Sequence, residues 1–126
     1  MVRNYYPSRL KRFNNSLLNE KIPFFQLKLD ENGLPPKDEF GNQLEVYEFV
    51  MNVWANMQLV PIEDKELNST VYNKLKYKAI IRYTKKIDEN NFFLYKGVMY
   101  RINYAEDFYG EGRFLDCLGT RIEKSV

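Results

Sequence analysis

The chain of 126 residues contains no histidine, one cysteine and one tryptophan. The absence of histidine removes the commonest general base and the commonest ligand of transition metals. A single cysteine cannot form a disulfide framework, which fits a reducing compartment. No apolar run approaches the roughly 20 residues that a transmembrane helix requires. These absences count against histidine-based enzymes, disulfide-rich domains and helical membrane proteins.

Charge and cysteine chemistry exclude further classes of function. The net charge of +2 is too small to indicate a nucleic-acid or membrane partner through bulk electrostatics. The neighbouring acidic pairs lie in predicted turns and lack the spacing of a calcium-binding loop. Cys117 is expected to face the interior as an unreactive thiol, because a reactive cysteine needs an activating base or cation beside it. The sequence therefore offers no catalytic residue, metal site or cofactor site, and binding is the class that remains.

Aromatic residues are abundant, with ten Tyr and nine Phe, and they favour strands over helices. Residues 78–83 and 92–102 both have strand character, and Lys96-Gly97 divides the second run. Because glycine tolerates the positive φ of a two-residue turn, Phe92 to Tyr95 should fold back on the residues after Gly97. Every odd position from Tyr47 to Leu59 is apolar, which predicts a long, bent strand. Val50 and Trp54 interrupt its polar face, so we expect a bulge or a second contact surface near them.

These patterns predict an all-β protein, namely a small antiparallel β-barrel of five to six strands with a long polar loop and a short N-terminal helix. The helix should begin at Ser8, because Leu10, Phe13 and Leu17 recur at helical spacing. We expect a single domain, residues 1–126, comprising an extension over 1–22, a barrel over 23–120 and a loop over 61–76. The predicted barrel core consists of Phe25, Leu27, Tyr47, Phe49, Val53, Ile81, Val98, Tyr100, Ile102 and Leu115.

Several short motifs occur in an order that resembles the head-tail joining (head closure or stopper) protein family of tailed bacteriophages. They are Asp38-Glu39-Phe40-Gly41, Val46-Tyr47-Glu48, Val53-Trp54-Ala55-Asn56-Met57, Ile80-Ile81-Arg82-Tyr83 and Tyr95-Lys96-Gly97-Val98-Met99-Tyr100-Arg101-Ile102. The resemblance covers about Pro23 to Thr120. The chain departs from the family by a longer leader, Ser8 to Lys21, and by an apparent insertion, Asp30 to Lys37. Both departures can alter which neighbour the protein docks on.

The resemblance implies a structural virion protein that forms a ring, usually twelve-fold, and is not an enzyme. The ring would lie in the neck, below the portal or adaptor and above a tail terminator or tail tube protein. There it would close the DNA-filled head and join it to the tail, while double-stranded viral DNA passes through without sequence recognition. Synthesis would take place in the cytoplasm of the bacterial host. The resemblance also implies that a long loop of the protein plugs the DNA channel, and the matching loop here is residues 61–76. Its candidate residues are Glu63, Asp64, Lys65, Glu66, Asn68 and Lys74.

Exposed apolar residues are the candidates for contacts with neighbouring copies or partners, although they fit equally well as plain core residues. They are Val50, Trp54, Leu10, Phe13 and Leu17. A tail terminator or adaptor is the alternative within the neck. From a different class, an OB-like module that binds single-stranded nucleic acid would use basic and aromatic residues on the outer sheet face, including Arg82 and Arg101.

Overall fold

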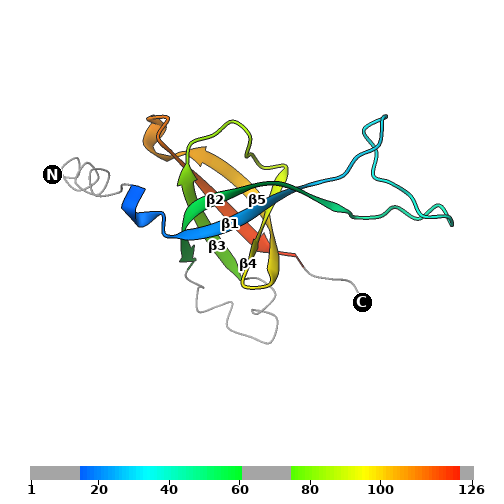
Figure 1. The fold of residues 1–126 in the computed structure, drawn as a ribbon, viewed down its shortest axis with the longest axis horizontal. Helices are drawn as coiled ribbons and strands as arrows, with labels where there is room; N and C mark the ends of the chain where they lie inside the picture. Colours follow the sequence, from blue (N-terminus) through cyan, green and yellow to red (C-terminus); the bar gives the residue numbers. More distant parts are fainter. Residues whose placement is uncertain (1–14, 61–74, 123–126) are drawn as a thin grey trace, which may run out of the picture.

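The computed structural model describes residues 15–60 and 75–122. There, six antiparallel strands close into a barrel in the order β1-β2-β3-β6-β5-β4 (Figure 1). A 3-10 helix, η1 (Asn15–Leu17), precedes the barrel, and a second one, η4 (Phe108–Gly110), follows β5. The strands are β1 (Glu20–Leu27), β2 (Tyr47–Leu59), β3 (Lys76–Arg82), β4 (Asn91–Tyr95), β5 (Val98–Asp107) and β6 (Phe114–Arg121). The predicted all-β barrel is confirmed, and the described residues contain no helix long and apolar enough to cross a membrane.

The start of the barrel differs from the prediction. β1 begins at Glu20 and runs through Pro23, where the sequence had placed the boundary of the N-terminal extension. Pairing of β1 with β4 begins only at Phe24, so Pro23 lies where β1 has β2 as its sole partner. A proline fits this position because no ladder hydrogen bond is required on the open side. Of the helix predicted from Ser8, residues 8–14 lie outside the described residues, and Asn15–Leu17 form one 3-10 turn.

The hairpin between β4 and β5 forms as predicted. Tyr95 pairs with Val98, and Phe92 pairs with Arg101. Lys96 and Gly97 have φ values of 50° and 79°. Two successive residues with positive φ match the right-handed twist of the flanking strands. This local turn therefore sets the register of the central hairpin.

A β-bulge at Val50 changes which residues of β2 face the core. Phe24 pairs with Met51 and Phe25 pairs with Phe49, which leaves Val50 without an opposite residue on β1. Both Val50 and Met51 pack against the core, whereas Phe49 is 57% exposed. The predicted bulge is thus present, and the unbroken inward alternation from Tyr47 to Leu59 is wrong. An extra residue in one strand exchanges the two faces of the strand on either side of it.

The barrel interior is filled with side chains. Phe24, Phe93, Ile81, Ile102 and Cys117 are the largest side chains that are fully buried. Of the predicted core, Ile81, Tyr100, Ile102 and Leu115 are buried, and Val53 and Val98 are partly buried against them. The remaining four predicted core residues, Phe25, Leu27, Tyr47 and Phe49, lie on the outer face or are only partly buried. Ile22 and Phe24 take the inward positions of β1. The sequence did not distinguish this arrangement from its opposite, because Phe24 and Phe25 are adjacent and either one can belong to an apolar alternation.

A second, smaller apolar cluster lies outside the barrel. Leu18 packs there with Ile80 and Phe114, and Phe108 covers the cluster from one side. The Nδ2 of Asn56 donates a hydrogen bond of 3.0 Å to the carbonyl oxygen of Leu17. These contacts fix η1 and the chain after it against the outer wall of β3 and β6.

Candidate docking surfaces

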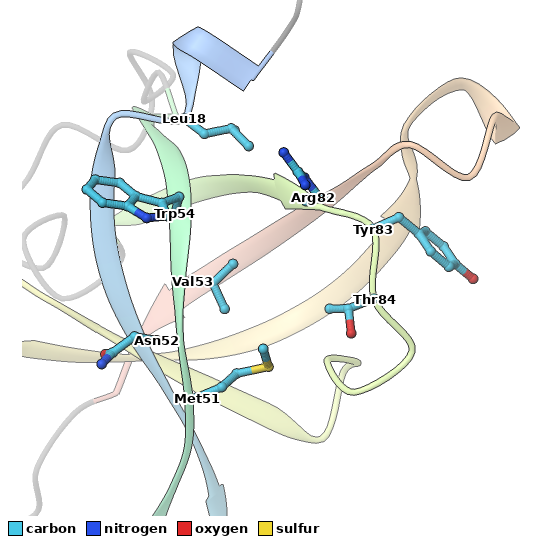
Figure 2. Close-up of a pocket in the computed structure, with 8 residues that line it drawn as sticks. All are labelled: Leu18, Met51, Asn52, Val53, Trp54, Arg82, Tyr83 and Thr84. Carbon is cyan, nitrogen blue, oxygen red and sulfur yellow. The ribbon is translucent and has the colours of Figure 1, made fainter.

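A cavity of about 550 Å³ lies in the wall of the barrel between β2 and the chain that leaves β3 (Figure 2). Within the described residues, β3 pairs with β2 only from Ala55 to Leu59. Residues 47–54 of β2 therefore have β1 as their only partner strand. The lining consists of Leu18, residues 51–54 and residues 82–84, and we call this site the wall groove. It exists because β3 ends at Arg82 while β2 continues past it.

The wall groove combines an apolar floor with a positive charge at its edge. The side chains of Leu18, Val53 and Met51 point into it, whereas Trp54 lies on the other face of β2 (Figure 2). Arg82 is exposed, and no acidic side chain of the described residues pairs with it. An exposed guanidinium beside apolar side chains is suited to a partner that brings both a carboxylate and an apolar group.

The predicted interface residues are divided by the structure. Trp54 is 54% exposed and Leu17 is 38% exposed, so both offer apolar surface. Val50 is half-buried and packs against the core, because the bulge turns it inward. Leu10 and Phe13 lie outside the described residues. An interface role for Trp54 and Leu17 stays a prediction.

The connection between β1 and β2, residues 28–46, is a projecting arm (Figure 1). Its two sides are tied together by backbone hydrogen bonds, from Lys28 N to Val46 O at 2.8 Å and from Leu44 N to Pro36 O at 2.7 Å. It leaves the barrel on the side opposite η1 (Figure 1). The insertion predicted over Asp30 to Lys37 forms part of this arm, which we call the β1–β2 arm.

Two turns of the same design are built into the β1–β2 arm. In the first, the Asp30 carboxylate accepts hydrogen bonds from the backbone N–H groups of Asn32 and Leu34 at 2.8 and 2.9 Å. In the second, Asp38 accepts hydrogen bonds from Phe40 and Asn42, both at 2.9 Å. Each turn carries a glycine with positive φ at its fourth position. The two sequences, Asp30-Glu31-Asn32-Gly33-Leu34 and Asp38-Glu39-Phe40-Gly41-Asn42, differ at the third position and at the fifth position.

The β1–β2 arm is acidic and displays apolar side chains. It carries five carboxylates against two lysines, a net charge of −3, which leaves +5 on the rest of the chain. Phe40 at the second turn is 81% exposed, the highest value among the exposed large apolar side chains of the described residues. The hydrogen bond from the Asn42 backbone N–H lowers the pKa of Asp38, so the carboxylate stays charged beside Phe40 at neutral pH. The exposed large apolar side chains of the arm are Leu29, Leu34, Phe40, Leu44 and Val46.

Aromatic residues also gather on the outer face where β1, β2 and β4 meet. Phe25 contacts Phe49 edge to face with ring centroids 6.0 Å apart, and Tyr47 contacts Phe92 in the same way at 5.0 Å. The guanidinium of Arg101 lies 5.8 Å from the centre of the Phe92 ring. The predicted outward projection of Arg101 is therefore correct, and its contact within the chain is a cation–π interaction.

The structure decides two points of chemistry within the described residues, the reactivity of the cysteine and the grouping of metal-binding side chains. Cys117 is fully buried, and burial raises the pKa of its thiol to about 12, so it is not a nucleophile at neutral pH. No group of three Cys, Asp or Glu side chains in residues 15–60 and 75–122 could hold a metal ion. The candidate channel residues Glu63, Asp64, Lys65, Glu66, Asn68 and Lys74 lie outside the described residues, and their role stays a prediction.

Comparison with known proteins identifies the family. The sequence profile of the phage head completion proteins matches residues 14–122, which include all six strands. The chain belongs to this family. The resemblance drawn from the short motifs is thereby confirmed at the level of the family, whereas a search of curated proteins finds no match.

Two solved structures share the barrel of this head completion protein. A chain from the virion of a native gene transfer agent particle aligns with a TM-score of 0.59 at 12% identity, covering 82% of this chain and 94% of the other. The solution structure of protein SF1141 from Shigella flexneri 2a aligns with a TM-score of 0.58 at 21% identity, covering 86% and 96%. At these identities the similarity establishes the fold alone.

Proposed function

We propose that this head completion protein is a structural component of the neck of a tailed phage, where it closes the DNA-filled head and joins it to the tail. The observation that carries the proposal is the family match over residues 14–122. The fold shared with a chain of a gene transfer agent virion supports it. The protein would be made in the cytoplasm of the host and then incorporated into the virion, and it would act through contacts without catalysis.

A ring is the assembly that fits this role. The interior of one barrel is filled by large side chains such as Phe24 and Phe93, so duplex DNA cannot pass through a single copy. DNA can pass only through an opening enclosed by several copies. Copies that present different surfaces to successive neighbours close into such a ring. We propose a ring of twelve, with the portal or adaptor on one side and the tail terminator or tail tube protein on the other.

Contact with DNA in this role is non-specific. With a net charge of +2, the isolated protein should bind DNA weakly, with an affinity that falls steeply as salt is raised. Sub-micromolar binding of single-stranded DNA at physiological salt, lost when exposed aromatic residues are removed, would instead support an OB-like nucleic-acid binder.

The test of the proposed function is a phage whose gene for this chain carries an early stop codon. Cells infected with it should accumulate DNA-packaging heads and separate tails, with few infectious particles. Addition of the purified chain to these extracts should restore infectivity. A phage that assembles infectious particles at the normal level without the chain would contradict the proposal.

A further inference from the structure

The β1–β2 arm projects away from the barrel, and the wall groove lies in the barrel wall along residues 51–54 of β2. The arm leaves the barrel on the side opposite η1, whereas Leu18, immediately after η1, lines the groove (Figures 1 and 2). A hairpin of this length reaches on the order of 25 Å. An arm that points away from its own groove can reach the groove of another copy. Such a contact joins two different surfaces and repeats from copy to copy.

The two surfaces are complementary in chemistry. The tip of the arm presents the exposed ring of Phe40 between the carboxylates of Asp38 and Glu39 and Gly41. The groove presents apolar side chains beside Arg82, which has no acidic partner among the described residues. A phenyl ring can enter the apolar floor while a carboxylate pairs with the guanidinium. The arm has a net charge of −3 and the rest of the chain has a net charge of +5, so electrostatic attraction favours the approach of the arm of one copy to the barrel of another.

We propose that the β1–β2 arm of one copy docks into the wall groove of a second copy, with Phe40 as the anchor and Glu39 facing Arg82. The cavity of about 550 Å³ lies in the usual size range of binding pockets and accommodates a phenyl ring with its neighbours. Of the two carboxylates next to Phe40, Asp38 accepts the hydrogen bonds of its own turn. Glu39 is therefore the one that can pair with Arg82. The proposal goes beyond the head completion role and is tested with the isolated chain.

The contact is small, so a single one is weak. One aromatic anchor and one ion pair bury much less surface than a stable interface, and the affinity should be in the millimolar range. In a closed ring every copy makes the contact twice, once through its arm and once through its groove. Placement on a preformed template raises the effective concentration, and the same weak contact then holds neighbours together.

The test mixes two variants, neither of which can form the contact with another copy of itself. The acceptor is the isotope-labelled full chain with Phe40→Ala, which keeps its groove. The donor is the unlabelled full chain with Arg82→Glu, which keeps Phe40 at the tip of its arm. Because the groove of the donor has lost its positive charge, the arm of the donor should bind only the groove of the acceptor, whose Arg82 is intact. At millimolar donor, amide signals of the acceptor at Val53 and Thr84 should shift and should reach saturation.

The chain supplies its own matched control. Asn32 occupies in the first turn the position that Phe40 occupies in the second. A donor with Asn32→Ala and Arg82→Glu should shift the groove signals as before, whereas a donor with Phe40→Ala and Arg82→Glu should not. The proposal is overturned if the groove signals do not move at millimolar donor, or if they move equally with a donor that lacks Phe40.

A charge exchange tests the partner assigned to Arg82. A donor with Glu39→Lys that keeps its own Arg82, and so does not complement its own groove, should bind the acceptor that retains Arg82 several-fold more weakly. The same donor should recover its affinity toward an acceptor with Phe40→Ala and Arg82→Glu. If the exchanged pair binds no better than either single change, Glu39 does not face Arg82. Because these measurements need no phage particles, their failure leaves the head completion role standing.

Discussion

The barrel and the β1–β2 arm of this protein are stabilised in different ways. Strands of the barrel pair across long stretches of sequence, as β3 does with β6, and enclose a core in which Phe93 stacks on Tyr100 with ring centroids 5.2 Å apart. The arm has no buried residue, and its backbone hydrogen bonds join positions within residues 28–46. Burial therefore holds the barrel, whereas turn chemistry shapes the arm.

This difference separates the folding of the protein from its contacts. A change in the arm alters an exposed surface without opening the core, and an insertion there costs little because loop-closure entropy grows slowly with length. The segment Asp30 to Lys37, predicted to be an insertion relative to the pattern of the family, lies in this region. We expect such chain-specific contacts to be carried by the arm and the common fold to be carried by the barrel.

The largest expected effect comes from comparing two phenylalanines. Phe93→Ala empties a fully buried position and should lower the free energy of unfolding by about 3–5 kcal/mol. Phe40→Ala removes an exposed ring and should change it by less than about 0.5 kcal/mol. Urea denaturation of the isolated chain measures both. Similar losses in the two variants would show that the arm packs on the barrel in solution.

Two glycines provide the next comparison. A Cβ at Gly119 would lie 2.4 Å from the Phe93 ring, so Gly119→Ala should cost about 1–3 kcal/mol through overpacking. Gly41 has open space around it but a φ of +84°, so Gly41→Ala strains only its own turn. In thermal unfolding, Gly119→Ala should clearly lower the Tm, whereas Gly41→Ala should not. Faster hydrogen exchange at the Asn42 amide should report the change at Gly41.

Trp54 lies on the barrel, but its substitution should affect the stability of the fold as little as a substitution in the arm. Because about half of its surface is exposed, Trp54→Ala should leave the chain folded and cost at most about 1 kcal/mol. Phe24→Ala on the neighbouring strand is the matched control and should cost several times more. Circular dichroism with urea denaturation distinguishes the two. If Trp54→Ala unfolds the monomer, Trp54 is a core residue and its interface assignment is wrong.

The smallest expected effect is the response of the arm to acid. The pKa of Asp38 is lowered in the fold from an ordinary value of 3.8, so its carboxylate stabilises the turn above that value. This contribution is lost as the pH falls through the folded pKa. The Phe40 and Asn42 amide signals should therefore titrate with a midpoint below 3.8. An Asp38→Asn variant, which retains an acceptor oxygen but does not ionise, should remove that titration.

Local signals in the sequence determined much of the barrel. Lys96-Gly97 predicted the central hairpin because a turn with positive φ at both residues is a local property of the backbone. The order of the short motifs predicted the family, and the interruption at Val50 predicted the bulge. Inward positions such as Ile81 and Leu115 followed from regular alternation along β3 and β6. The inward position of Ile102 followed in the same way, because the register shift in β5 comes only after it, between Ile102 and Tyr104.

Only the tertiary structure decided the positions where alternation was ambiguous or interrupted. The choice between Phe24 and Phe25 depended on pairing with β4, because Phe24 lies opposite Phe93, and the bulge turned Phe49 outward. The wall groove was not visible in the sequence, because it arises where β3 ends while β2 continues. The length over which two strands pair is set by the closure of the whole barrel. The sequence therefore determined the kind of fold and its local turns, whereas barrel closure decided which apolar residues remain available for a partner.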